Sequence, residues 1–187
     1  MSLIWKRKRR GLSQKKLDEL ERQIRADQSR APFAFASADA MRLAANVLSQ
    51  AGVSGHRFLN PTEAKVPDRQ VVWVLPNGII GGFKGLRNAA RIRLEDAAAQ
   101  AIAANMKGCM GDSASGKKRA NTLGGGEMLK FFIACRDPSL EIHYTMVKTP
   151  QGALLTFAHF SRAGSGTGAV MQADDVLTRN ANFALPQ

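Results

Sequence analysis

The sequence predicts an α+β protein: an antiparallel sheet of about five strands, covered by an Ala-rich helix and preceded by a basic helical arm. Three apolar segments, 128–135, 140–147 and 153–160, are separated by Asp137-Pro138 and by Thr149-Pro150-Gln151-Gly152. Short segments rich in Phe, Ile and Val between such turn signals are typical of an antiparallel, three-stranded meander. Residues 95–106 are rich in Ala and open with two acidic residues, which predicts the covering helix.

Upstream of the meander, a predicted hairpin supplies two further strands. Residues 70–75 and 79–83 flank Pro76-Asn77-Gly78, and Asn-Gly between two apolar runs is a strong hairpin signal. Gly81-Gly82 in the return strand predicts a bulge or a close backbone approach. Residues 91–94 are a candidate for one more short strand. Residues 110–126 are rich in Gly and Ser, so we expect a loop there.

The chain divides into four predicted parts. They are a basic helical N-terminal arm (1–52), a connector (53–69), the α+β body (70–162), and a linker with a C-terminal tail (163–187). The arm contains two segments with helical periodicity, and Ser13 and Ser37 are the residue type that caps such helices. On the first helix, Leu17, Leu20 and Ile24 form a narrow apolar stripe, which suits a partner helix better than a protein core.

Positive charge is concentrated at the start of the chain. The net charge is +12, and residues 1–30 contain ten Lys or Arg against four Asp or Glu, which is half of that excess. A basic arm of this kind favours an anionic macromolecule, with nucleic acid as our first expectation and an anionic membrane or an acidic protein as the second. The cations that we expect to contact this partner lie in the arm and in the predicted loop: Lys6, Arg7, Lys8, Arg9, Arg10, Lys15, Lys16, Lys117, Lys118 and Arg119.

The two cysteines, Cys109 and Cys135, lie at the two ends of the predicted loop region. A disulfide between them would join the Ala-rich helix to the meander and stabilise the fold by about 3 to 4 kcal/mol. Disulfides persist in oxidising compartments. The sequence has no run as long as a membrane span, and no apolar segment of a secretory signal follows the first basic run. We therefore expect a cytoplasmic protein if Met1 is the native start, and a periplasmic or secreted one if the chain is a trimmed mature form.

Three polar residues of the meander are candidates for a catalytic site. His143 and His159 fall on adjacent predicted strands, and Glu141 shares the polar face of His143. If the register places the two imidazoles opposite each other, Glu141 can serve as their acid–base partner. The strict alternation of residues 140–146 predicts that this polar face is exposed to solvent while the opposite face is buried.

Two other kinds of site fit the sequence poorly. Two cysteines and three scattered histidines do not supply the closely spaced ligand pairs of a zinc site. Residues 111–118 nearly match a phosphate-binding loop, but Lys118 replaces the hydroxyl residue that binds magnesium, and the run follows a helix instead of a strand. We therefore expect no metal and no cofactor.

Three functions remain open. The leading hypothesis is a non-enzymatic binding or assembly module whose basic arm engages nucleic acid through phosphate contacts. The second is an envelope or secretion-system subunit with a Cys109–Cys135 disulfide and an arm that lies beside a membrane or docks a partner. The third is a small enzyme with its polar site at His143, Glu141 and His159.

Overall fold

The computed structural model describes residues 14–66, 68–122, 125–162, 167–179 and 183. The chain divides into two compact units, Met1–Pro32 and Phe33–Gln187. In the first unit the described element is helix α2 (Gln14–Arg30), which matches the first predicted helix. Along residues 14–23 the side chains of α2 are exposed, except that Leu17 is partly buried.

An antiparallel sheet forms the centre of the second unit, so the predicted fold class is correct. The described part of the chain contributes eight strands to this sheet, and the predicted number of about five was too low. The strand order is β2-β3-β4-β8-β7-β6-β5, and the short strand β1 pairs with β4 outside this path. The bounds are β1 (Phe33–Ala34), β2 (Arg57–Leu59), β3 (Val71–Val74), β4 (Ile80–Arg87), β5 (Met110–Asn121), β6 (Glu127–Asp137), β7 (Leu140–Lys148) and β8 (Leu154–Arg162).

The predicted meander and hairpin are both present. Strands β6, β7 and β8 pair in sequence order, and the N–H of Gly152 donates to the carbonyl of Thr149, 2.9 Å away, in the turn between β7 and β8. Strands β3 and β4 form the hairpin around Asn77-Gly78, where Gly78 has a φ of +82°. Tight turns of this kind need the left-handed backbone that glycine adopts at low cost.

The two additional strands of the main path lie where the sequence pattern predicted none. Residues 110–121 form the edge strand β5, which pairs with β6 along most of its length, so the predicted loop is wrong there. An edge strand is held by backbone hydrogen bonds on one side and needs few apolar side chains, which is why its Gly- and Ser-rich sequence is typical of a loop. Strand β2 lies inside the predicted connector. The expected strand at 91–94 is also wrong, because helix α4 (Leu94–Met106) begins there.

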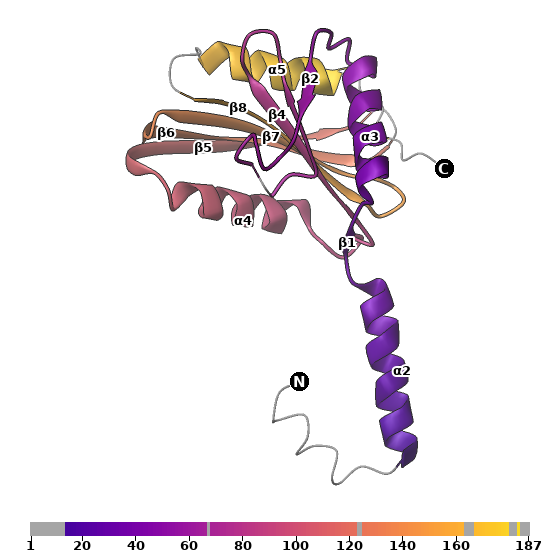
Figure 1. The fold of residues 1–187 in the computed structure, drawn as a ribbon. Helices are drawn as coiled ribbons and strands as arrows, with labels where there is room; N and C mark the ends of the chain where they lie inside the picture. The colour runs from indigo at the N-terminus through magenta and orange to yellow at the C-terminus, as the bar shows by residue number, and fades with distance from the viewer. Residues whose placement is uncertain (1–13, 67, 123–124, 163–166, 180–182, 184–187) are drawn as a thin grey trace. The chain divides into compact units, whose positions relative to one another are not determined.

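Helices cover both faces of the sheet (Figure 1). The predicted Ala-rich helix, α4, packs on one face against β6 and β7, where Leu94 and Ala98 are buried. Helix α3 (Ser37–Gln50) and helix α5 (Thr167–Arg179) pack on the opposite face. Leu43 and Val47 of α3 join the same buried cluster as strand residues Phe83 and Phe157. Helix α3, which the sequence analysis assigned to the arm, is therefore part of the second compact unit.

Gly81 and Gly82 mark a close approach of side chains to the backbone of β4. The register between β3 and β4 is continuous, so the alternative of a bulge is not realised. A Cβ on Gly81 would overlap the indole ring of Trp73, and a Cβ on Gly82 would lie 2.9 Å from Cγ of Arg69. The two glycines therefore accommodate two large side chains on opposite faces of the sheet. None of the described helices is long and apolar enough to cross a membrane.

Candidate functional site

The two candidate histidines belong to a row of residues that crosses the sheet on the face covered by α3 and α5. Strand register pairs His143 of β7 directly with His159 of β8, which is the condition that the predicted polar site requires. The row also contains Gly81 and Gly116, and the aromatic rings of Trp73 and Phe132 lie beside these two glycines. In strand order from β3 to β5 it is Trp73, Gly81, His159, His143, Phe132 and Gly116.

Each histidine contacts a different aromatic ring of this row. The rings of Trp73 and His159 meet edge to face, with centroids 5.6 Å apart. The rings of Phe132 and His143 are stacked, with centroids 5.9 Å apart. A Cβ on Gly116 would approach Phe132 to 2.6 Å, so this glycine makes room for the ring. The row thus carries the polar imidazoles of two histidines and also packs each of them against an aromatic ring.

His159 is closed off from solvent. Its exposed fraction is 1%, and burial lowers the pKa of its imidazole to about 4, with the attraction of Asp174 opposing this effect. The ring is therefore neutral at pH 7. Within the described ranges, neither Nδ1 of His159 nor Nε1 of Trp73 has a hydrogen-bond partner. A substrate cannot reach this imidazole unless the structure opens.

His143 and Glu141 form the accessible half of the predicted site. Nε2 of His143 lies 2.7 Å from Oε1 of Glu141, and each side chain is 14% exposed. His143 also lines a cavity of about 470 Å³, together with Lys118, Lys130 and Asp174. A carboxylate that hydrogen-bonds one ring nitrogen orients an imidazole for proton transfer at the other. The structure thus brings one of the three predicted residues, His143, to a cavity and places Glu141 in hydrogen-bond contact with it. The enzyme hypothesis stays a prediction that rests on this pair.

A buried ion pair joins helix α5 to the sheet beside this cavity. Asp174 is 1% exposed; it accepts a hydrogen bond of 2.8 Å from Oγ1 of Thr145 and lies 2.9 Å from Nζ of Lys130. Asp175 lies 2.6 Å from the same Nζ. Burial lowers the pKa of Lys130, but the charges and hydrogen bonds of Asp174 and Asp175 outweigh burial and raise it. Lys130 therefore keeps its proton and holds α5 in place.

This ion pair corrects the prediction for the polar face of β7. We expected Glu141, His143 and Thr145 to face solvent, but Thr145 is fully buried beneath α5. The alternation in the sequence identifies which residues share a face and does not reveal that a helix will cover it. Asp174 was missed for the same reason, since no local pattern distinguishes a buried carboxylate in an amphipathic helix from an exposed one.

The three cations predicted for a loop lie on the exposed edge strand β5. In the register of β5 with β6, Lys118 lies opposite Lys130 on the face covered by α5. Lys117 and Arg119 lie opposite residues whose side chains belong to the other face of the sheet. Arg119 forms an ion pair with Glu95 of α4, and Lys117 and Lys118 line the same cavity as His143. They are not one patch on a loop. Charged side chains on an edge strand also hinder pairing with other chains, which is a structural role for all three.

The cations predicted in the arm are only partly described. Lys6, Arg7, Lys8, Arg9 and Arg10 lie outside the described residues. Lys15 and Lys16 are exposed on α2. In the apolar stripe predicted to bind a partner helix, Leu17 is partly buried and Leu20 is 40% exposed. The side chain of Ile24 is not among those that the structure describes.

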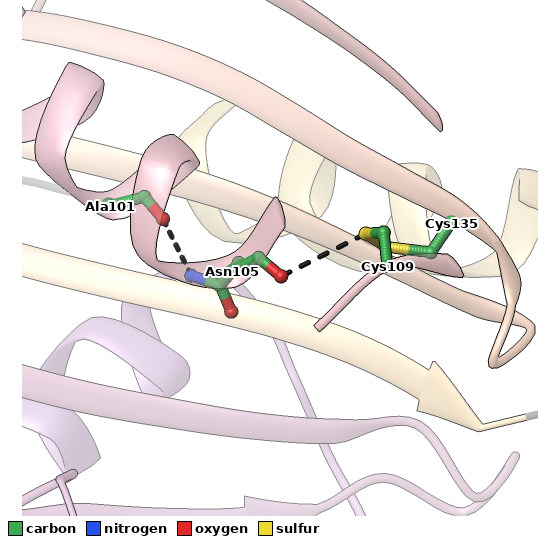
Figure 2. The surroundings of a disulfide bond; sticks show 4 residues. All are labelled: Ala101, Asn105, Cys109 and Cys135. Carbon is green, nitrogen blue, oxygen red and sulfur yellow. Dashed lines mark hydrogen bonds between the residues drawn. A yellow bond between two sulfur atoms is a disulfide. The ribbon is translucent and has the colours of Figure 1, made fainter. Parts of the chain in front are cut away.

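Cys109 and Cys135 form the predicted disulfide, with their Cα atoms 5.4 Å apart. Cys109 follows α4 and Cys135 lies on β6, so the bond ties the end of the helix to the sheet. Figure 2 shows the last turn of α4 beside it, where Nδ2 of Asn105 donates to the carbonyl of Ala101 over 2.8 Å. Sγ of Cys109 also contacts the carbonyl oxygen of Asn105, at 3.8 Å.

The described residues form no metal-binding cluster, and two comparisons with known proteins give no match. Among the described residues, no three or more His, Cys, Asp or Glu are grouped so that they could hold a metal ion. Comparison of the chain with models of known protein families gives no match. Comparison with curated proteins also gives no match.

Proposed function

We propose that the chain is a non-enzymatic binding or assembly module whose basic N-terminal arm attaches it to an anionic partner. The observation that supports this proposal is the division at Pro32: residues 1–32 form a compact unit of their own, and the charged side chains of residues 14–23 within it are exposed. Charges that are exposed can attract a partner, whereas charges neutralised inside a protein cannot.

The basic run in Lys6–Arg10 supplies most of the attraction in this proposal. Helix α2 contains five Lys or Arg and four Asp or Glu, so its own net charge is only +1. The run before it contains five cations and no acid, next to Trp5. A short basic run beside an aromatic residue suits a lipid headgroup surface, where the ring lies at the interface and each cation contributes about 1 kcal/mol.

The disulfide between Cys109 and Cys135 favours one of the two settings that the sequence left open. Nucleic acid ranked first on charge alone, but a structural disulfide is expected in an oxidising compartment, where nucleic acid is an uncommon partner. We therefore favour an envelope or secreted subunit whose arm contacts an anionic membrane surface. Binding of the arm to nucleic acid becomes the alternative outcome of the test.

Sedimentation with vesicles tests this proposal. We expect the full chain to bind vesicles that contain phosphatidylglycerol, to bind neutral phosphatidylcholine vesicles weakly, and to lose binding as salt increases. A variant with all five residues of Lys6–Arg10 replaced by Gln should lose most of its binding. A control variant that removes two charges from β5, Lys117→Gln with Lys118→Gln, should keep it.

Two results would count against the proposal. If the five-site variant binds as well as the parent chain, the arm is not the attachment site. If the parent chain binds a DNA duplex tightly and ignores the vesicles, the membrane setting is wrong and the nucleic-acid hypothesis replaces it.

A further inference from the structure

A second cavity lies on the α4 face of the sheet, opposite the face that carries His143 and His159. Its volume is about 500 Å³, within the range of roughly 300 to 1,000 Å³ that is usual for small-molecule sites. It lies over β7 and β8, between the last turn of α4 and the segment that contains Val66, Asp68 and Arg69. No residue predicted from the sequence as part of a site lines it.

Three polar side chains converge at one end of this cavity, around the hydroxyl group of Tyr144. This oxygen accepts a hydrogen bond of 3.2 Å from Nη2 of Arg69 and one of 3.1 Å from Nδ2 of Asn105. Because the phenol already accepts two hydrogen bonds, its own proton is available to donate. No acceptor for that proton is found in the described part of the chain. The end of the cavity is thus rich in donors.

Arg69 adds a positive charge that the protein neutralises incompletely. Its side chain is 10% exposed and lies over the Tyr144 ring, with Cζ 5.4 Å from the ring centroid. Its ionic partner among the described residues is Asp68, at 3.7 Å; the Asp68 side chain is 63% exposed, so water weakens the pair. A guanidinium group carries five N–H donors, and a cation removed from water favours an anionic partner.

The rest of the lining is mainly apolar and fixed by the sheet. Ile142 and Phe160 project from β7 and β8 and are at most 8% exposed, and Leu140, Val66, Pro138 and Ala158 also line this part. The stem of Arg69 lies against Gly82, where a Cβ would approach Cγ of Arg69 to 2.9 Å. The glycine therefore allows the guanidinium to reach across the sheet to Tyr144.

We propose that this cavity binds an amphipathic carboxylate, a molecule with an apolar chain or ring and one anionic end. The carboxylate accepts hydrogen bonds from Arg69 and from the hydroxyl of Tyr144, and the apolar body packs on Ile142, Phe160 and Leu140. A planar carboxylate matches the fork of a guanidinium group in both geometry and charge. This inference does not depend on the basic arm.

Isothermal titration of the oxidised full chain with decanoate, below its micelle concentration, tests this inference. We expect one saturable site per chain. Arg69→Met should weaken the affinity about tenfold or more, and Tyr144→Phe should weaken it by a smaller factor, because Arg69 contributes an ion pair with the carboxylate whereas the phenol of Tyr144 contributes one hydrogen bond from a neutral donor. Arg93→Met removes one charge from an exposed side chain outside the cavity and should leave the affinity unchanged.

Two further comparisons test the inference. Decylamine has the same apolar chain with the opposite charge and should bind about tenfold more weakly or worse. The five-site arm variant should bind decanoate as the parent chain does, which separates this site from adsorption to the arm. Absence of a saturable site overturns the inference, as does equal affinity for decanoate and decylamine. If Arg69→Met does not fold, unchanged affinity in Tyr144→Phe overturns it as well.

Discussion

Asp174 on α5 lies 2.9 Å from Nζ of Lys130 on β6, and its side chain is 1% exposed. This ion pair holds a helix over the part of β7 where the sequence pattern predicts solvent. It also forms one wall of the cavity that His143 reaches. The position of α5, and with it the shape of this cavity, therefore depends on a charge pair between segments distant in the sequence.

Replacing Lys130 should destabilise the protein strongly. Lys130→Met removes the cation but leaves the buried carboxylate of Asp174, and an unpaired buried charge costs about 3 to 5 kcal/mol. Lys84→Met removes an exposed lysine from β4 and should change stability by less than about 0.5 kcal/mol. Urea denaturation measures both variants. Equal stability of the two would show that Asp174 does not need its partner.

His159 should make the protein less stable in mild acid. Burial lowers its pKa from 6.5 to about 4, so between these values the unfolded chain binds a proton that the folded chain does not. Stability from this group is fully present above pH 6.5 and is lost as pH falls towards 4. The loss amounts to about 3 kcal/mol.

The variant His159→Phe should remove this part of the pH dependence. Denaturation of the parent chain and of the variant is compared over that range, with His56→Gln as a matched loss of a histidine from outside the row. The difference between parent and His159→Phe should grow steadily between pH 4 and 6.5 and then become constant. Parallel curves for the two proteins would contradict the assignment of His159 as a buried neutral imidazole.

Gly81 should tolerate no side chain. A Cβ there would overlap the indole of Trp73, so Gly81→Ala should cost about 1 to 3 kcal/mol or more through strain and displacement of the ring. Gly108→Ala is the control, because the nearest atom to its added Cβ would be 3.7 Å away. Thermal denaturation compares the two variants. A Gly81→Ala protein as stable as Gly108→Ala would mean that Trp73 does not pack against β4 as described.

Much of the fold follows from local patterns, and the failures have a common cause. The presence of α3, of the hairpin at Asn77-Gly78 and of the meander was predictable because periodicity and turn residues lie within each segment. The predicted cap of α3 is wrong, since Ala36 takes the capping position and Ser37 is the first residue of the helix. Strand β5 was missed because its polar sequence forms a strand only by pairing with β6. Within the candidate site, Glu141 and His143 are two positions apart on one strand, so their proximity was predictable.

The contacts that no local pattern could predict join distant segments. The hydrogen bond from Arg69 to Tyr144 connects residues 75 positions apart, and the one from Thr145 to Asp174 connects residues 29 positions apart. Each depends on where the sheet places two elements, which is decided by packing of the whole domain. The cavity beside Arg69 could therefore be found only in the structure.

Loss of the disulfide should lower stability without changing the fold class. The Cys109→Ser, Cys135→Ser double variant should lose about 3 to 4 kcal/mol, because the bond closes a loop with a sequence separation of 26 residues in the unfolded chain. Guanidinium denaturation of the oxidised protein, the reduced protein and the double variant measures this loss. Stability that is equal in all three would mean that the bond does not constrain the unfolded chain.

The proposal that this domain works in an oxidising compartment is tested most directly by the state of its thiols in the cells that make it. Cells are quenched in acid, the protein is alkylated under denaturing conditions with and without reductant, and its mass is measured. We predict that Cys109 and Cys135 take up alkyl groups only after reduction. Complete alkylation of both cysteines without reductant would contradict the proposal and return nucleic acid to first place among the partners of the basic arm.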